Sequence, residues 1–304
     1  NVTPDVLTPR PDTETVVEYV LRDFPEHAPW SILDLGIGSG AIILSILAER
    51  PAARGVGIDV SEEALAVARD NAAHLGLAGR LALLRGDWTE GLAESQFDLV
   101  VSNPPYIASH VIETLEPEVR DHEPRIALEG GPDGLMHYRR LAPEILRVLK
   151  PGGRFVFAGE PTRHGDYVAR RLSRFTWWAT TRITKLPQLA DWRRPQVELD
   201  ESSRAAALEA VVDIHTFVPA ELAALAREQG AADVKVATSE LFASWFGWPV
   251  RTFECAVPKE KLGMRWANFA LHGWQRLARL DERLEKFVAP GLFYNAEITG
   301  RKPS

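Results

Sequence analysis

Residues 31–49 have the sequence SILDLGIGSGAIILSILAE, and this stretch decides the fold. Its first five residues form a short apolar run that is typical of a buried strand, and residues 41–49 have the spacing of a helix. The turn between them contains Gly36, Gly38 and Gly40, whose missing side chains let the backbone bend sharply and point its amides at a ligand. A strand, a glycine turn and a helix in this order indicate a parallel sheet with crossover helices.

The same alternation of short apolar runs and helical patterns continues along the chain. We expect further strands at 55–60, 81–85, 97–102, 154–159, 234–238 and 293–299. We expect helices at 62–75, 138–149, 220–229 and 263–287, the second of them closed by Lys-Pro-Gly-Gly at 150–153. Together these elements predict an α/β, Rossmann-like fold with a seven-stranded, mostly parallel sheet, helices on both faces and a helical insertion.

No shift in composition separates independent domains, so the predicted divisions follow the pattern of elements. They are a lead-in segment at 1–30, a ligand-binding and catalytic half at 31–159, a helical insertion or lid at 160–212, and a half at 213–304 that completes the sheet. Seven of the nine tryptophans follow residue 160, so an aromatic substrate pocket, if one exists, is expected there.

The composition disfavours several classes of function. A net charge of −7 argues against a large nucleic-acid interface, which needs clustered Lys and Arg to neutralise phosphates. One cysteine leaves no internal disulfide, and the eight histidines lack the spacing of metal ligands. No apolar run reaches the roughly 18 residues that span a bilayer, and residues 1–5 do not look like a secretion signal. We therefore expect a cytoplasmic protein without a metal or a membrane partner.

The glycine turn and the ends of the next two strands predict a binding site for S-adenosylmethionine. The glycines follow the pattern G-x-G-x-G, with Asp34 just before them, whereas nicotinamide enzymes use G-x-G-x-x-G. Asp59, at the end of the second strand, is placed to accept hydrogen bonds from two ribose hydroxyls; the alternative is a helix cap beside Ser61. Asp87 offers a carboxylate to the adenine amino group, and Trp88 an indole that packs on the ring, unless that tryptophan is a buried structural residue.

The most specific signal is Asn103-Pro104-Pro105-Tyr106, which follows the fourth strand at the edge of the sheet where ligands bind. Methylation of a planar nitrogen requires acceptors that hold its two hydrogens and keep its lone pair aimed at the methyl group. The side-chain oxygen of Asn103 and the backbone carbonyl of Pro104 can be these acceptors. The consecutive prolines fix the backbone, and Tyr106 can stack on the planar group. The alternative is an Asn-Pro turn that merely ends a strand.

The predicted reaction is a direct displacement that needs no strong general base before transfer. Most of the rate enhancement is expected to come from alignment of the nitrogen, the methyl carbon and the sulfur, and the proton can leave the nitrogen afterwards.

Residues 1–157 resemble the HemK-type release-factor glutamine methyltransferases, which modify the glutamine of a Gly-Gly-Gln motif in peptide-chain release factors. The resemblance implies a class I methyltransferase fold, S-adenosylmethionine as the methyl donor, N5 methylation of glutamine and a release factor as the partner. It implies that Gly36 to Gly40, Asp59, Trp88 and Asn103 bind the donor, while Asn103 to Tyr106 hold the glutamine amide. The motifs that carry it are LTPRPDTE at 7–14, DLGIGSG at 34–40, GDW at 86–88, SNPPYI at 102–107, LEPEVR at 115–120 and GGPDGL at 130–135.

Two departures accompany this resemblance. The family begins with a helical domain that would precede Asn1, and the sequence does not tell whether such a domain is missing. After residue 159 the sequence instead resembles the carboxyl half of generic actinobacterial class I methyltransferases, and we hypothesise a join near residue 158 in a natural recombinant or an artificial chimera. The stretches that carry this second resemblance are IHTF at 214–217, WFGWPVRT at 245–252, FYN at 293–295 and GRKP at 300–303.

Several other residues have two interpretations. Trp245 and Trp248 are expected in a core rather than in a substrate pocket, and His215 is expected to be a capping or surface residue rather than an acid-base group. Arg10 and Glu14 either touch the donor or pair on a helix by their four-residue spacing. The Arg139-Arg140 pair is expected on a solvated helix face.

Three functions remain open from the sequence. The leading hypothesis is N-methylation of a protein glutamine in the Gly-Gly-Gln loop of a release factor. The first alternative is methylation of a small molecule whose identity is set by the second half of the chain. The second alternative is a protein that binds the donor without turnover, because a joined half can close the pocket wrongly.

Overall fold

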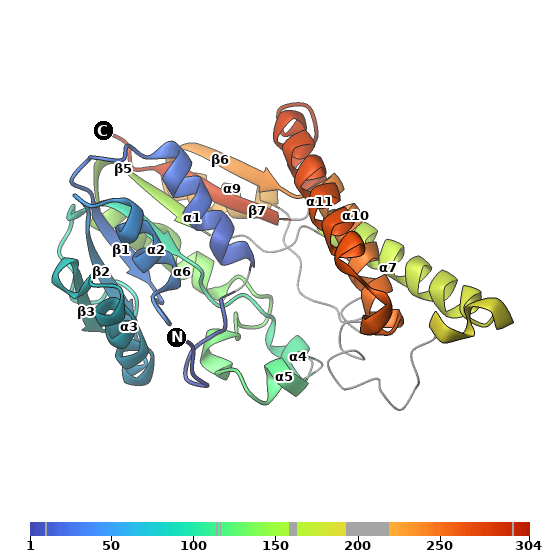
Figure 1. Cartoon of the computed structure of the whole chain (residues 1–304). Coiled ribbons are helices and arrows are strands. Elements are labelled where there is room, and N and C mark those ends of the chain that lie inside the picture. The colour runs from blue at the N-terminus through green and yellow to red at the C-terminus, as the bar shows by residue number, and fades with distance from the viewer. Residues whose placement is uncertain (10, 114, 116, 158–162, 193–218, 294) are drawn as a thin grey trace. The chain divides into compact units, whose positions relative to one another are not determined.

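The computed structural model describes the chain except for residues 10, 114, 116, 158–162, 193–218 and 294 (Figure 1). The described chain forms two compact units, each assembled from separated segments. Unit 1 contains residues 1–160, 217–237 and 296–304, and unit 2 contains residues 161–216 and 238–295. The predicted divisions after residues 30, 159 and 212 cut the chain into consecutive segments, whereas the two units combine segments that are distant in sequence. These divisions remain predictions. No described helix is both long and apolar enough to cross a membrane.

Unit 1 is built on a seven-stranded sheet, which confirms the predicted fold class. β1 pairs with β2 and β4, β2 with β3, and β4 with β5, all in parallel, whereas β7 runs antiparallel to β5. The spatial order of the strands is β3 (Leu81–Arg85), β2 (Arg54–Asp59), β1 (Ser31–Leu35), β4 (Phe97–Ser102), β5 (Leu149–Phe157), β7 (Asn295–Arg301) and β6 (Ala232–Ser239).

Helices cover both faces of this sheet because successive residues of a strand point to opposite sides. Ile32 of β1 packs in a core with Val16 and Ile43, which belong to helices α1 and α2. The next residue, Leu33, packs in a second core with Leu141 of α6. The helices of unit 1 are α1 (Pro11–Asp23), α2 (Ala41–Glu49), α3 (Glu62–His74), α4 (Ser109–Ile112), α5 (Pro117–Arg120), α6 (Met136–Val148) and α9 (Pro219–Glu228), with 3₁₀ turns η1 (Ala78–Arg80) and η2 (Arg125–Ala127).

Unit 2 is helical. Asp281 of α11 is buried, and its carboxylate accepts hydrogen bonds from the backbone amides of Leu241, Phe242 and Ala243, each at 2.9 Å, where α10 begins. A carboxylate at this place satisfies amides that have no partner within the helix. The elements of unit 2 within the described residues are α7 (Arg163–Ile183), α10 (Phe242–Ala256) and α11 (Met264–Leu284), with 3₁₀ turns η3 (Pro187–Trp192), η5 (Lys259–Lys261) and η6 (Pro290–Leu292).

The fifth and seventh strands differ from their predicted bounds. β5 begins at Leu149, five residues before the prediction, because Lys150 to Gly153 belong to the strand rather than to a helix end. The pairing of β5 with β4 shifts register here, so an irregular stretch absorbs the Pro-Gly-Gly sequence. β7 begins at Asn295 rather than at Phe293, because residues 290–292 form η6.

Candidate active site

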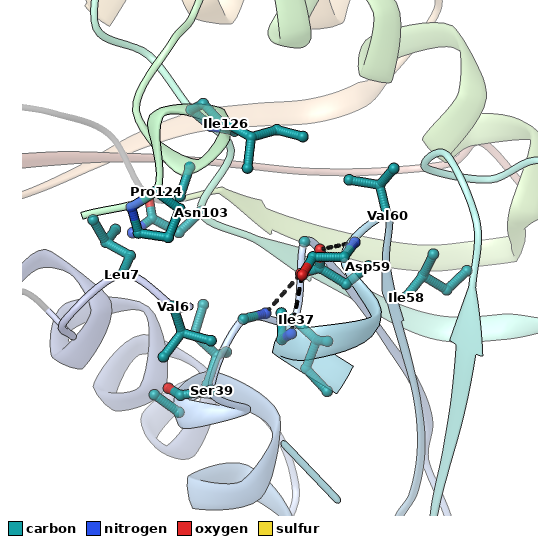
Figure 2. Close-up of a pocket in the computed structure, with 18 of the residues that line it drawn as sticks. Val6, Leu7, Ile37, Ser39, Ile58, Asp59, Val60, Asn103, Pro124 and Ile126 are labelled. Atoms are coloured by element: carbon teal, nitrogen blue, oxygen red, sulfur yellow. Dashed lines mark hydrogen bonds between the residues drawn. The ribbon is translucent and has the colours of Figure 1, made fainter. Parts of the chain in front are cut away.

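A cavity of about 400 Å³ lies at the carboxyl ends of β1, β2, β3 and β4, and all of its lining residues belong to unit 1. Figure 2 shows residues from distant parts of the sequence around it, among them Val6, Ile37, Asp59 and Asn103. A cleft at this edge is where open α/β sheets bind their ligands. The cavity therefore holds most of the residues that the sequence predicts for donor binding.

The glycine turn forms one wall of the cavity. Gly36 and Gly38 line it and have φ angles of 71° and 52°, in the left-handed region that favours glycine. A Cβ on Gly38 would meet nothing within 4 Å, so the backbone there is open to a ligand. Gly40 has a φ of 82° at the start of α2, but it does not line the cavity. Gly36 and Gly38 can therefore contact a ligand through their backbone, whereas Gly40 allows the backbone to enter α2.

Asp34, which the sequence groups with the donor-binding glycines, does not line the cavity. Its side chain is fully buried in β1, and one carboxylate oxygen accepts a hydrogen bond from the amide of Ile43 at 3.3 Å. Burial raises the pKa of this carboxyl from 3.8 to about 8. Asp34 therefore ties β1 to α2 on both sides of the glycine turn.

Asp59 lines the cavity and also supports the turn. One carboxylate oxygen accepts from the amide of Gly38 at 2.9 Å, and the other accepts from the amide of Ser61 at 3.0 Å. Ser61 itself caps α3 by accepting from the amide of Ala64 at 3.0 Å. Ligand contact and helix capping are therefore compatible, because each carboxylate oxygen has a second lone pair for a hydroxyl donor.

Trp88 and His137 form an aromatic wall. Trp88 is half-buried, lines the cavity and has a φ of 56°, which is rare for a bulky residue. Its ring lies 5.2 Å from that of His137, whose Nε2 is 3.1 Å from the carbonyl oxygen of Glu129. Burial lowers the pKa of His137, which favours the neutral imidazole. This wall suits a flat ring such as adenine.

Arg140 is a cavity residue, which corrects the predicted solvated face for this member of the pair. Its guanidinium lies 2.8 Å from the carboxylate of Asp87, 3.3 Å from Glu144 and 3.7 Å from Glu90. The predicted adenine contact, Asp87, lines the cavity and is held by this pair. Its neighbour Arg139 is exposed and pairs with Asp133 at 2.6 Å, as expected of a solvated face.

Asn103 lines the cavity at the end of β4. Its side-chain Nδ2 donates to the hydroxyl of Thr13 at 3.4 Å, while its Oδ1 is buried and has no hydrogen-bond partner among the described residues. An unpartnered buried acceptor is costly unless a ligand completes it. Oδ1 of Asn103 is therefore available to accept a hydrogen bond from a ligand.

The rest of the predicted quartet divides between the cavity and the core. Pro105 lines the cavity. Pro104 is buried and Tyr106 packs against the core beside β4, and neither lines the cavity. In this structure Tyr106 is therefore not placed for the stacking that the sequence predicts.

Part of the cavity wall is missing from the sequence-based predictions. Leu7, Pro9 and Thr13 line the cavity from the start of the chain, and Pro124 and Ile126 line it from the segment around η2. Residues 7, 9 and 13 lie in the LTPRPDTE motif, which was a possible signal. The η2 segment carries no comparable signal.

The remaining candidates either do not line the cavity or lie outside the described residues. Trp245 and Trp248 belong to α10 of unit 2, and Trp245 packs edge-on against Phe242 at 5.2 Å. Arg10 and His215 lie outside the described residues, and Glu14 is exposed on α1. No group of three potential metal ligands occurs within the described part of the chain.

Comparison with known proteins defines the class. Residues 26–171, just under half of the chain, match the family described as "Methyltransferase domain". The resemblance of the N-terminal half to release factor glutamine methyltransferases is also confirmed.

The relative from Caulobacter vibrioides bears that name and is 70% identical over 154 residues, which are 51% of this chain and 53% of the relative. The relative from Geobacter sulfurreducens is 47% identical over 152 residues, 50% and 52% of the two chains. The chain thus spans about half the length of the curated relatives that it matches.

The solved structures that resemble the chain include phosphoethanolamine N-methyltransferase 2 of Haemonchus contortus in complex with S-adenosyl-L-methionine. It has a TM-score of 0.49 and 17% sequence identity, and the match covers 96% of this chain and 53% of that one. A putative sarcosine dimethylglycine methyltransferase of Galdieria sulphuraria matches with a TM-score of 0.49 and 13% identity, over 100% and 94% of the two chains. The resemblance of the second half of the chain to actinobacterial methyltransferases remains a prediction.

Proposed function

We propose that this protein transfers a methyl group from S-adenosylmethionine to the side-chain amide nitrogen of a glutamine in a peptide-chain release factor. The observation that carries the proposal is the buried, unpartnered Oδ1 of Asn103 at a cavity beside the glycine turn. The names of the relatives of the N-terminal half support the same substrate.

The cavity residues fit the methyl donor. Gly36 and Gly38 leave backbone exposed for the methionine end, Asp59 offers carboxylate oxygens to the ribose, and Trp88 offers a flat surface to the adenine. Arg140 holds Asp87 beside that surface. When bound, S-adenosylmethionine supplies an electrophilic methyl group on a sulfonium.

The part of the cavity beside Asn103 is proposed to bind the planar side-chain amide of the substrate glutamine. Oδ1 of Asn103 accepts one of the two amide hydrogens. The Pro104 carbonyl is the proposed second acceptor, although Pro104 is buried and does not itself line the cavity. Holding both hydrogens fixes the amide plane, so that the nitrogen faces the methyl carbon. Pro105 restricts the backbone around this point. The chain needs no strong base before transfer, because the proton leaves after the new bond forms.

The test is transfer of labelled methyl to a release factor containing the Gly-Gly-Gln loop. Asn103→Ala is expected to lower the turnover rate by at least about 100-fold, as removal of a positioned hydrogen-bonding group in an active site does. Donor affinity, measured by calorimetry, should stay within a few-fold of the parent. Unchanged turnover in this variant would place the chemistry elsewhere.

A small-molecule substrate is the second candidate. It is favoured by one observation: the match to the Caulobacter vibrioides relative covers 154 residues of the 304, so half of the chain lies outside it. Label that appears only in small molecules from a cell extract, and not in the release factor, would favour this candidate. Donor binding without any label transfer would favour a protein that does not turn over.

A further inference from the structure

One face of α7 is exposed, aromatic and basic. Tyr167, Phe175 and Trp178 are 55%, 64% and 52% exposed, which is unusual for large aromatic side chains. With the exposed Arg171, Arg174 and Arg182 they fall within an arc of roughly 100° at 3.6 residues per turn. These six residues are called the α7 stripe.

The opposite face of α7 is small and buried. Ala169, Ser173 and Thr180 are buried, and α7 packs against α10 in unit 2. The helix therefore does not need the α7 stripe for its own packing. Of the nineteen exposed large hydrophobic side chains in the described chain, thirteen belong to unit 2, and three of these are in the stripe.

The arginines of the stripe are available to an anion. Residues 163–185 contain six Lys and Arg but one acidic residue, in a chain whose net charge is −7. Arg171 and Arg182 lie over the rings of Tyr167 and Trp178 at 4.7 and 5.0 Å. Arg171, Arg174 and Arg182 form no ion pair with any residue that the structure describes. Cations held beside exposed rings can bind phosphates while the rings enter an apolar layer.

We infer that the α7 stripe binds the surface of a membrane that contains anionic lipids. Tyr, Trp and Phe side chains settle at the level of the lipid headgroups, and arginines there contact phosphates. Ile183, at the end of α7, and Leu186, beyond it, are also exposed. Single-stranded nucleic acid fits less well, because its bases need open ring faces in a channel. The sequence predicts no membrane partner because it contains no apolar run long enough to span a bilayer, but binding at the membrane surface does not require such a run.

Sedimentation with lipid vesicles tests this inference. The full chain should sediment with vesicles of phosphatidylglycerol and phosphatidylcholine but much less with phosphatidylcholine alone, and added salt should weaken the binding. Arg171→Gln with Arg182→Gln should weaken partitioning about 30-fold, because each removed cation costs several-fold. Phe175→Ser with Trp178→Ser should also weaken it, at both low and high salt.

The matched control changes the same charge elsewhere. Arg22→Gln with Arg69→Gln alters two exposed arginines of unit 1 and should leave partitioning within about twofold. Circular dichroism of every variant should match the parent, because the substituted side chains are exposed. Equal loss in the control, or no difference between the two vesicle types, would overturn the inference. Binding to a labelled single-stranded oligonucleotide without vesicle binding would overturn it in favour of nucleic acid.

Discussion

Asp34 is a buried acid whose ionisation opposes folding. Its pKa is raised to about 8 by burial, whereas in an unfolded chain it is about 3.9. Between these pH values the folded state keeps the proton and the unfolded state releases it. Its contribution to stability is therefore complete below about pH 4 and is lost as the pH rises to about 8.

Asp34→Asn keeps the shape of the side chain and its acceptor for the Ile43 amide, but it cannot ionise. We expect the free energy of unfolding of this variant, relative to the parent, to increase steadily from pH 5 to pH 8. Urea denaturation at several pH values measures the difference. A difference that stays constant with pH would show that the carboxyl ionises normally in the folded state.

Thr13 is expected to orient the amide of Asn103. Its hydroxyl accepts a hydrogen bond from Nδ2 of Asn103, so that Oδ1 of Asn103 remains available to a substrate. Thr13→Val should lower the turnover rate about tenfold, the effect of one neutral hydrogen bond, with little change in donor affinity. Thr13→Ser should restore most of the rate. If Thr13→Val weakens donor binding and leaves turnover intact, the residue acts on the donor side instead.

At the scale of elements, α6 fixes the segment that follows β3. Arg140 holds Asp87 and Glu90, while Arg147 donates to the carbonyl oxygens of Thr89 and Leu92 at 3.0 and 2.7 Å. Trp88 lies inside this segment with a left-handed backbone. The shape of the aromatic wall therefore depends on contacts between a helix and a segment about 50 residues away.

Arg140→Ala is expected to weaken donor binding about 5- to 10-fold, since it removes several partly exposed ion pairs and leaves neighbouring carboxylates to repel one another. Arg139→Ala is the matched control, because Arg139 pairs with Asp133 away from the cavity and should have no effect on affinity. Calorimetric titration with the donor measures both. Equal affinities in the two variants would refute the role of Arg140.

The strands and the glycine turn could be predicted from local sequence, whereas contacts between distant segments could not. β1, β3 and β4 match their predicted bounds because each is a short apolar run with a turn on either side. The glycine turn was predictable for the same local reason. β5 begins earlier than predicted because its pairing partners override the breaking effect of Pro-Gly-Gly. Arg140 was predicted on a solvated face because its partner Asp87 lies 53 residues away in the sequence. The residues around η2 were not predicted because they line the cavity only through the tertiary fold.

At the scale of the whole molecule, the chain leaves unit 1 twice to build unit 2. Residues 161–216 and 238–295 form unit 2, while the cavity is lined by unit 1 alone. Donor binding should therefore survive damage that is confined to unit 2.

Asp281 allows this to be tested, because its carboxylate satisfies three amides at the start of α10. Asp281→Ala leaves these amides unpaired in a buried place and should destabilise unit 2 by about 3 kcal/mol. Asp191→Ala is the control in the same unit, since the side chain of Asp191 is 85% exposed. Below the first unfolding transition, both variants should bind the donor as the parent does. A loss of donor affinity in Asp281→Ala that parallels its loss of stability would mean that the two units unfold together.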